Sequence, residues 1–326
     1  MRIAVDAMGG DNAPFEIIKG VLEASLEIKE GIVLVGRKSE IEKYLPSSHP
    51  NITIQDAKEV IGMDESPVSA IKKKPDASIA VACKMVRRRE ADAIVTAGNT
   101  GVMLAAGITL IGRLRGIERP AIACLLPSKL GQVLLLDAGA NVDCKPTQLF
   151  QFGIMGKVYA EEVLGIQNPR VSLLNIGEEE GKGNRLTDKA AELLSGSAVN
   201  FCGNIEGRDI ILGKCDVVVC DGFVGNSIIK FGEGIAEFII DEIRQNAGFV
   251  NKIGLLFLKG LFKNLLKKID YAEYGGAPLL GLEGVSIICH GRSKSKAIKN
   301  AIKVASRASS HHINDRIEEE LGATKR

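Results

Sequence analysis

The chain has 326 residues, of which 45% are hydrophobic and 25% are charged, and these values are typical of a globular protein. Its formal net charge of +2 is too small for a protein that binds the nucleic-acid backbone non-specifically. With ten Phe, four Tyr and no Trp, the chain is also poor in rings on which bases stack. The composition therefore predicts no nucleic-acid partner.

No internal repeat and no Pro/Ser-rich linker divides the sequence. We therefore expect residues 1–326 to form a single unit with interwoven lobes. Seven cysteines occur without a C-x-x-C pair, which indicates neither a zinc site nor a disulfide framework. The first residues, MRIAVDAMGG, lack the long apolar segment of a signal peptide. Together these features predict a reducing, cytoplasmic location and no bound metal.

Short β-branched runs alternate with longer helical patterns along the chain. Because several of the runs are uninterrupted and apolar, as in strands buried on both faces, the alternation predicts an α/β fold with a mainly parallel sheet and helices on both sides. Strands are expected at 2–7, 31–36, 52–56, 91–98, 121–127, 133–139, 170–177, 215–222 and 284–291. Helices are expected at 14–29, 77–90, 100–113, 146–164, 186–195, 225–246 and 294–319.

Residues 93–112 carry no charge over 20 residues, a length that can span a bilayer. Asn99, Thr100 and four glycines interrupt this stretch. The pattern therefore favours a buried strand, a tight glycine turn and a helix whose N-cap is Asn99 or Thr100.

Six polar, glycine-rich segments each follow an apolar strand: DAMGGDNAP, AGNTG, LDAGAN, NIGEEEGKGN, CDGFVGN and CHG. Ligands of parallel sheets bind outside the carboxyl ends of the strands, and glycine lets backbone N–H groups approach an anion. We therefore expect the six loops to lie at equivalent strand ends and to form one extended site. The phosphate- and substrate-binding residues expected there are Gly9, Gly10, Asp11, Asn99, Thr100, Gly101, Asn141, Gly177, Gly183, Gly225 and His290.

The motifs of a serine nucleophile elbow, a zinc protease and a P-loop are missing from the sequence. The loops offer lysine, asparagine, aspartate and backbone N–H groups, which suit an acyl transfer in which phosphate attacks a thioester directly, without a covalent enzyme intermediate. Lys182 is the expected cation for phosphate or oxyanion, and its alternative is a solvated loop lysine. Asn226 is expected to open the helix 225–246, where N-terminal amides favour anions, or to be a plain N-cap. Asp221 is expected to be a base or an orienting group, with a cap carboxylate as the alternative.

Residues 250–270 read VNKIGLLFLKGLFKNLLKKID and differ from the rest of the chain. On a helical wheel, the large apolar residues fall on one face and the lysines on the other. This pattern suits an amphipathic excursion that faces a membrane surface or a hydrophobic partner, and ordinary core or dimer packing is the alternative. The expected membrane-facing residues are Leu255, Leu258, Phe262, Leu265, Leu266, Lys259, Lys263 and Lys267.

The loop motifs, together with GNIEGRDI, YGGAPLLGLEG and the HGRS that follows, run in order from residue 6 to residue 293. As a set they resemble the bacterial acyl-acyl-carrier-protein:phosphate acyltransferases, the PlsX family. The resemblance implies a three-layer α/β/α sandwich like that of phosphotransacetylases and isopropylmalate dehydrogenases. It also implies transfer of a long-chain acyl group from acyl carrier protein (ACP) to inorganic phosphate, giving acyl phosphate for phospholipid synthesis.

The same resemblance implies a cytoplasmic homodimer that associates peripherally with the membrane. There it would supply a membrane glycerol-3-phosphate acyltransferase. No cofactor is expected apart from the phosphopantetheine arm that ACP carries.

Three other functions stay open. The first is a phosphate acyltransferase that uses coenzyme A and short acyl groups. The second is an NAD-dependent dehydrogenase of related fold, although its metal-binding acids and arginine clamp are not evident. The third is a catalytically silent membrane scaffold that binds acidic ACP through Arg87, Arg88 and Arg89 or through the lysines of residues 250–270.

Overall fold

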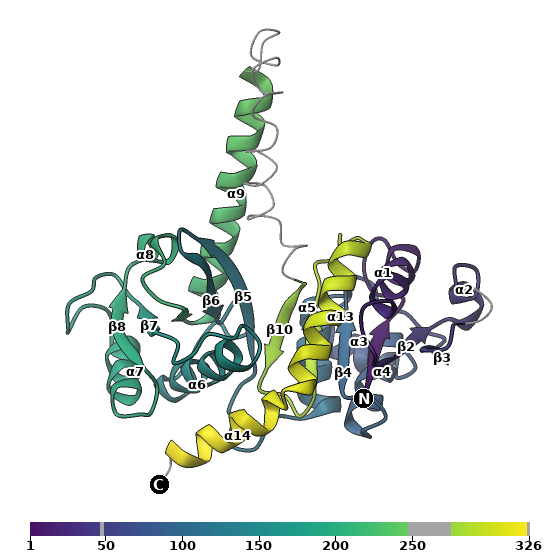
Figure 1. The fold of residues 1–326 in the computed structure, drawn as a ribbon, viewed down its shortest axis with the longest axis horizontal. Helices are drawn as coiled ribbons and strands as arrows, with labels where there is room; N and C mark the ends of the chain where they lie inside the picture. The colour runs from purple at the N-terminus through teal and green to yellow at the C-terminus, as the bar shows by residue number, and fades with distance from the viewer. Residues whose placement is uncertain (46–48, 247–274, 325–326) are drawn as a thin grey trace.

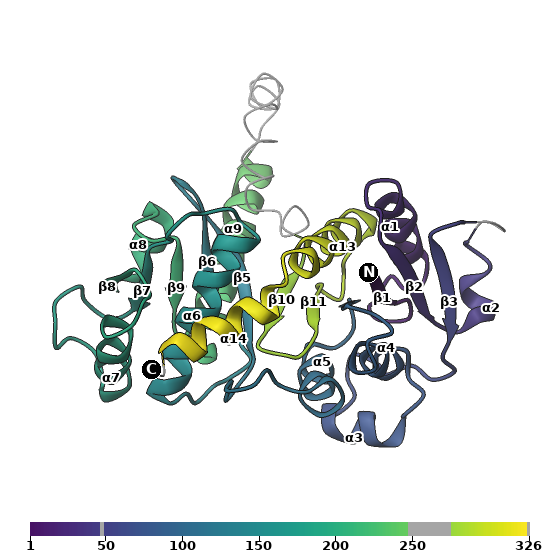
Figure 2. The ribbon, with the colours of Figure 1, turned by 60° about the horizontal axis from the view of Figure 1, so that its bottom comes forward.

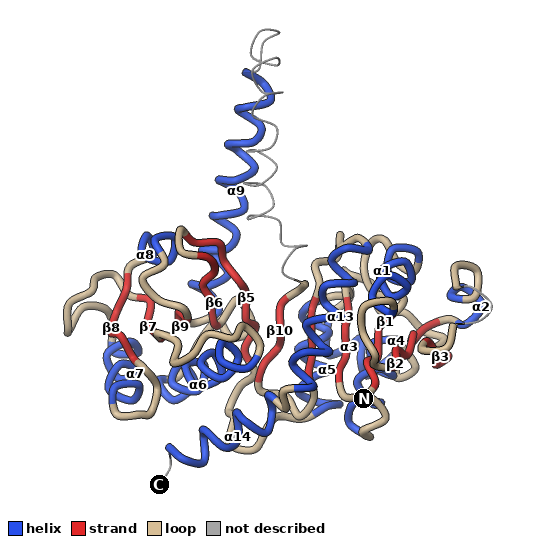
Figure 3. The backbone as a smooth tube through the Cα atoms, in the orientation of Figure 1, coloured by secondary structure: helices blue, strands red, loops and turns tan. Residues whose placement is uncertain are grey.

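The structure is a computed structural model that describes residues 1–45, 49–246 and 275–324 (Figure 1). Its centre is an 11-stranded sheet with the order β3-β2-β1-β4-β11-β10-β5-β6-β9-β7-β8, whose strands are red in Figure 3. The strands are β1 (Arg2–Asp6), β2 (Gly31–Gly36), β3 (Ile52–Asp56), β4 (Ala93–Thr96), β5 (Ala121–Ser128), β6 (Gly131–Leu136), β7 (Val171–Leu174), β8 (Phe201–Ile205), β9 (Val217–Val219), β10 (Ala277–Leu280) and β11 (Val285–Ile288).

Helices cover both faces of this sheet, as Figure 2 shows. A core that contains Ile17, Phe152 and Ile298 lies under one set of helices, and a second core around Cys83 and Met103 lies under another. This arrangement confirms the predicted α/β/α sandwich. The helices are α1 (Phe15–Ser25), α2 (Lys38–Ile41), α3 (Pro67–Lys73), α4 (Ser78–Arg87), α5 (Thr100–Ala106), the π-helix η1 (Gly107–Ile111), α6 (Pro146–Glu162), α7 (Arg185–Ser195), α8 (Gly207–Leu212), α9 (Gly222–Asn246), α13 (Ser295–Ser310) and α14 (Ile313–Thr324).

The direction of the strands changes across the middle of the sheet. Strands β3, β2, β1, β4 and β11 pair in parallel, and so do β6, β9, β7 and β8. Between these two sets, the steps β11–β10, β10–β5 and β5–β6 are antiparallel. The two parallel sets therefore run in opposite directions. The expectation that all six glycine loops share equivalent strand ends was wrong for this reason.

Several local predictions can be compared directly with the structure. Residues 93–112 form β4, a turn, α5 and η1, which confirms the strand–turn–helix interpretation. The expected helix 294–319 is divided into α13 and α14 around His312, whose φ is +50°. Strands β8 and β10 and helices α2, α3 and α8 were not expected. No helix of the described residues is both long enough and apolar enough to cross a membrane.

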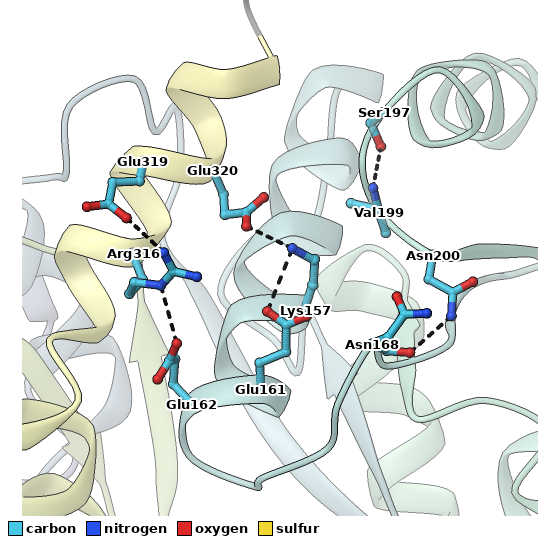
Figure 4. A network of polar contacts seen from close by, with 10 residues as sticks. All are labelled: Lys157, Glu161, Glu162, Asn168, Ser197, Val199, Asn200, Arg316, Glu319 and Glu320. Atoms are coloured by element: carbon cyan, nitrogen blue, oxygen red, sulfur yellow. Dashed lines mark hydrogen bonds and ion pairs between the residues drawn. The ribbon is translucent and has the colours of Figure 1, made fainter.

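Polar contacts between α14 and α6 tie the C-terminal helix to the middle of the chain (Figure 4). The Lys157 Nζ lies 2.8 Å from the Glu320 Oε1 and 3.6 Å from the Glu161 Oε2. On the same face, the Arg316 Nε donates to Glu162 at 3.2 Å. Lys157 is 9% exposed, so its contact with Glu320 is shielded from solvent and helps to hold the two helices in a fixed position.

Helix α9 extends far beyond the body of the molecule (Figure 1). It carries exposed apolar side chains along its length, among them Phe231, Phe238 and Ile239. The amphipathic stretch 250–270, with all eight expected membrane-facing residues, lies outside the described residues.

Candidate functional site

A pocket of about 450 Å³ opens beside the loops that follow β7 and β9. One part of its wall is apolar and comes from α6, β7, α7 and α9. The remainder is polar and comes from the loops. The lining residues are Leu149, Leu173, Leu174, Asn175, Ile176, Gly183, Asn184, Leu186, Thr187, Gly207, Cys220, Asp221, Val224 and Ile228.

The neighbouring loop after β6 is built around the carboxylate of Asp137, which is fully buried. Its Oδ1 accepts hydrogen bonds from the N–H groups of Ile122, Gly139 and Ala140 at 3.0, 3.2 and 3.0 Å. Its Oδ2 accepts from the N–H and the Nδ2 of Asn141 at 2.7 and 2.8 Å. Burial raises the pKa of Asp137, and these N–H donors oppose the rise because they stabilise the charged form. Asn141, expected to bind substrate, is thus a member of the loop's internal frame.

This frame sets the position of the start of α9. A Cβ on Gly225 would lie 1.9 Å from the Asp137 carbonyl oxygen, and a Cβ on Gly139 would lie 3.4 Å from the Asn226 Cβ. Glycine at position 225 therefore lets the loop after β6 and the first turns of α9 approach each other closely, whereas Gly139 is favoured by its φ of +129°. Asn226 is consequently held beside Gly139, with its side chain exposed.

The helix begins earlier than the sequence indicated. Helix α9 starts at Gly222, and the Asp221 Oδ1 accepts a hydrogen bond from the Val224 N–H at 2.9 Å, which is an N-cap contact. The expectation that Asn226 opens the helix was wrong, because Asp221 takes that role and Asn226 lies one turn further along. Asp221 both caps α9 and lines the pocket.

Lys182 lies on the loop between β7 and α7, next to Gly183 of the pocket wall. A hydrogen bond within the loop stabilises its conformation, because the Asn175 Nδ2 donates to the Lys182 carbonyl at 2.7 Å. A Cβ on Gly177 would lie 3.3 Å from the Lys182 Cγ, so Gly177 contacts the lysine stem. Lys182 itself is exposed, and within the described residues its ammonium has no carboxylate within ion-pair distance.

A second group of expected residues lies in the loops after β1, β4 and β11. The Asp11 N–H donates to the Gly291 carbonyl at 2.8 Å, next to His290. Gly10 has a φ of +97°, and a Cβ there would lie 2.9 Å from the Ala97 carbonyl. A Cβ on Gly9 would lie 2.5 Å from the Asp6 Oδ2. The three loops therefore pack tightly on one another.

Asn99, one of the two residues predicted for this role, is the N-cap of α5 and accepts from the Val102 N–H at 3.1 Å. Its Nδ2 donates to the Met63 carbonyl at 2.6 Å, so its amide group is already engaged at both ends. Thr100 is exposed at the first helical position. A Cβ on Gly101 would lie 2.9 Å from Pro67, so this glycine contacts α3.

The second core packs against both groups of residues. Val102 and Met103 belong to the second core, and Ala138 and Ala140 of the loop after β6 pack against that same core. Of the expected residues, Gly183 and Asp221 line the pocket. The others of this group lie in the loops and helix start that border it, namely Asn141, Gly177, Lys182, Gly225 and Asn226. Gly9, Gly10, Asp11 and His290 come together elsewhere, and Asn99 lines the small cavity beside Gly9, at the start of the helix that holds Thr100 and Gly101.

Sequence reasoning missed Asn175, Asn184 and Cys220 in the pocket wall. Asn184 was detectable, because its side chain caps α7 through the N–H groups of Leu186 and Thr187, a common role for asparagine before a helix. Burial raises the pKa of the Cys220 thiol well above its usual range, so the thiol is not activated for nucleophilic attack. Among the described residues, no cluster of His, Cys, Asp and Glu could hold a metal ion.

Comparisons with known proteins identify the family and the fold. The family model "Fatty acid synthesis protein" matches residues 1–316. A phosphate acyltransferase of Heliobacterium modesticaldum is 53% identical over 313 residues, which are 94% of this chain and 93% of the relative. A phosphate acyltransferase of Desulforamulus reducens is 50% identical over 327 residues, covering 98% of this chain and 97% of the relative.

Among solved structures, the fold resembles that of a phosphotransacetylase from Streptococcus pyogenes, with a TM-score of 0.65 at 14% identity, covering 95% of this chain and 94% of that one. It also resembles a branched-chain phosphotransacylase from Enterococcus faecalis, with a TM-score of 0.59 at 13% identity, covering 96% of this chain and 100% of that one. These two similarities show the fold. The two close sequence matches, each spanning nearly the full chain, show that this protein belongs to the fatty acid synthesis protein family of phosphate acyltransferases, enzymes that transfer an acyl group to phosphate.

Proposed function

We propose that this enzyme transfers a long-chain acyl group from ACP to inorganic phosphate, and that the reaction takes place at the pocket between α6, α7 and α9. The observation that carries the proposal is the composition of the pocket wall. Leu149, Leu186 and Ile228 offer an apolar surface for an acyl chain, whereas Asn175 and Asp221 form a polar part where a thioester and phosphate are better solvated.

The residues support direct attack of phosphate on the thioester carbonyl. In this step a phosphate oxygen forms a bond to the carbonyl carbon, and the carbonyl oxygen becomes an oxyanion. The C–S bond then breaks and the thiolate of the arm takes up a proton. Lys182 supplies a cation for the phosphate or the oxyanion, and the exposed amide of Asn226 supplies an N–H donor. Because the Cys220 thiol has a raised pKa, the proposal includes no covalent enzyme intermediate.

Phosphate approach is assigned to the start of α5. The Thr100 hydroxyl is exposed there, and Asn99 fixes the first turn by capping it. Asn99 acts in this proposal as a positioning residue, because both ends of its amide are already bonded. The glycine loops after β1 and β11, with Asp11 and His290, hold the neighbouring backbone in place.

We also propose a cytoplasmic homodimer that meets the membrane peripherally and passes acyl phosphate to a membrane glycerol-3-phosphate acyltransferase. The support is the exposed apolar side chains of α9, which projects from the body of the molecule (Figure 1). Such a surface is unusual for a monomer in water. No cofactor is proposed, since the thioester arm arrives with ACP.

The test is thiol release from palmitoyl-ACP and from palmitoyl-CoA, each with and without phosphate, with hydroxylamine present to trap acyl phosphate as hydroxamate. Phosphate-dependent release from ACP, with hydroxamate formed, is expected. If the enzyme used palmitoyl-CoA and not palmitoyl-ACP, the acyl donor would be a coenzyme A thioester instead of ACP. Release that does not depend on phosphate would contradict the proposal.

A further inference from the structure

A polar groove of about 480 Å³ lies next to the candidate pocket. Gln148 of α6 lines the groove, and its neighbour Leu149 lines the pocket. Adjacent residues of a helix point about 100° apart, so the first turns of α6, about 10 Å thick with side chains, separate the two spaces. We name this space the basic groove, and it is lined by Ile108, Arg113, Glu118, Arg119, Lys145 and Gln148.

The charge of the basic groove is predominantly positive, with Arg113, Arg119 and Lys145 against the carboxylate of Glu118. That carboxylate is occupied, because it accepts hydrogen bonds from the Thr147 Oγ1 at 3.0 Å and from the Gln148 Nε2 at 3.1 Å. The Arg113 guanidinium donates to the Glu118 carbonyl. Arg119 and Lys145 are exposed, and in the described part of the chain neither has a carboxylate within ion-pair distance.

The basic groove is rigidly connected to the loop after β6. The Asn141 Nδ2 donates to the carbonyl of Pro120, next to Arg119, at 2.8 Å. The same Nδ2 donates to the buried Asp137 carboxylate. A molecule that binds Arg119 and Lys145 is therefore held at a fixed position relative to the frame that places Asn226.

We propose that the basic groove is where the protein part of the acyl donor docks, through an acidic surface that meets Arg119 and Lys145. The inference rests on the proposed function, because it requires a donor whose thioester is carried by a protein. Charge complementarity at such a surface speeds encounter and fixes orientation. With the carrier docked in the basic groove, its flexible arm has to pass only the first turns of α6 to bring the thioester into the pocket.

The test uses the variant Arg119→Glu/Lys145→Glu, in which the positive charges of these two exposed side chains become negative. Octanoyl-ACP and S-octanoyl-pantetheine, the same thioester without the protein, are compared as donors at saturating phosphate. We expect the KM for octanoyl-ACP to rise at least about tenfold, while kcat and turnover of the pantetheine thioester change less than about twofold. Rising salt should lower kcat/KM with octanoyl-ACP for the unmodified enzyme and have less effect on the variant.

The matched control is Lys19→Glu/Lys43→Glu, which reverses two exposed cations on α1 and just after α2 and should leave both donors unaffected. An equal loss with both donors in Arg119→Glu/Lys145→Glu would overturn the proposal, and so would an unchanged KM for octanoyl-ACP or an equal loss in the control. Melting temperatures identify a variant that misfolds, and Arg119→Gln/Lys145→Gln then replaces it with the same expected selectivity.

Failure of the proposed function gives a different pattern, in which the unmodified enzyme shows no phosphate-dependent turnover of either donor. In that case calorimetric binding of ACP with its free phosphopantetheine arm decides the docking question. Binding that the charge reversal weakens at least about tenfold supports the basic groove. Absence of binding, or binding that the reversal leaves unchanged, overturns it.

Discussion

The loop after β1 and the loop after β6 both begin with Asp-Ala, yet they enclose very different spaces. The Asp6 carboxylate, 2% exposed, accepts from the Met8 N–H and the Thr96 hydroxyl, and hydrogen bonds from the Ser78 hydroxyl and the Gly9 N–H also act to lower its pKa. The cavity beside it is about 10 Å³, room for one water at most. Asp137 holds its loop with five N–H donors, and the neighbouring pocket is about 450 Å³.

The shape of a glycine loop and the size of the space beside it have different causes. In both places a buried carboxylate collects the hydrogen-bond donors of a tight turn, which is how a buried charge is stabilised. The loop after β1 is closed over by the loops after β4 and β11, with which Gly9 and Gly10 are in close contact. Near Asp137, α7 and α9 leave a space between Leu186 and Val224. Neighbouring elements, and not the glycine loop, decide whether a pocket forms.

The largest expected effect is the loss of the central carboxylate from each loop. Asp137→Ala leaves five donors without an acceptor and should lower the free energy of unfolding by about 3–5 kcal/mol. Asp6→Ala should lower it by about 1–3 kcal/mol, because two of the donors to Asp6 are the hydroxyls of Thr96 and Ser78, which can rotate to other acceptors. Urea denaturation at constant m-value measures both. Equal losses of unfolding free energy would show that the two carboxylates stabilise their loops equally, which would contradict the expected difference.

The next effect concerns turnover. Lys182→Ala should lower phosphate-dependent turnover at least about tenfold, or 1.4 kcal/mol, because it removes the cation beside the pocket. Lys182 is exposed, so the melting temperature should not change. Lys294→Ala, which removes an exposed lysine next to the closed loops, serves as the control and should keep full activity. If Lys294→Ala lost as much turnover as Lys182→Ala, the open pocket would not be the site of reaction.

The smallest expected effect is the pH dependence of the stability contributed by the ion pair between Arg170 and Asp216. This pair lies in the half of the sheet that holds the 450 Å³ pocket. Burial acts to raise the pKa of Asp216, but the hydrogen bonds and charge of Arg170 outweigh it and hold the pKa below its usual value. A lowered carboxylate pKa stabilises the fold above the unfolded pKa of about 4, and this contribution is lost as the pH falls through the folded value. Asp216→Asn should thus cost about 1 kcal/mol at pH 7 and less at pH 3.

The matched variant in the other half of the molecule, near α1 and α13, is Glu27→Gln, which removes the exposed ion pairs with Lys299 and Lys303. Solvent screens this pair, so its loss should change the melting temperature less than Asp216→Asn does. Thermal melts at pH 7 and pH 3 compare the two variants. A cost of Asp216→Asn that grew toward pH 3 would contradict the sign of the shift.

The sequence by itself determined the fold class and the residues of the loops. Uninterrupted apolar strands that alternate with helical patterns are typical of a sheet buried between two layers of helices, and Asn99 or Thr100 before an apolar helical pattern is a common kind of N-cap. Motifs that follow one another in order from residue 6 to residue 293 resemble a single family, and the comparisons confirm that membership.

Only the tertiary structure decided how the loops are grouped. The antiparallel steps at β10 and β5 reverse the second parallel set. Strand β10 is the segment APLL, which has weak strand character and whose pairing is set by its neighbours. The start of α9 at Gly222 also depends on contact with the Asp137 loop. Periodicity reports which face of an element is buried, but strand direction and pocket volume arise from contacts between residues far apart in the chain, which local sequence does not encode.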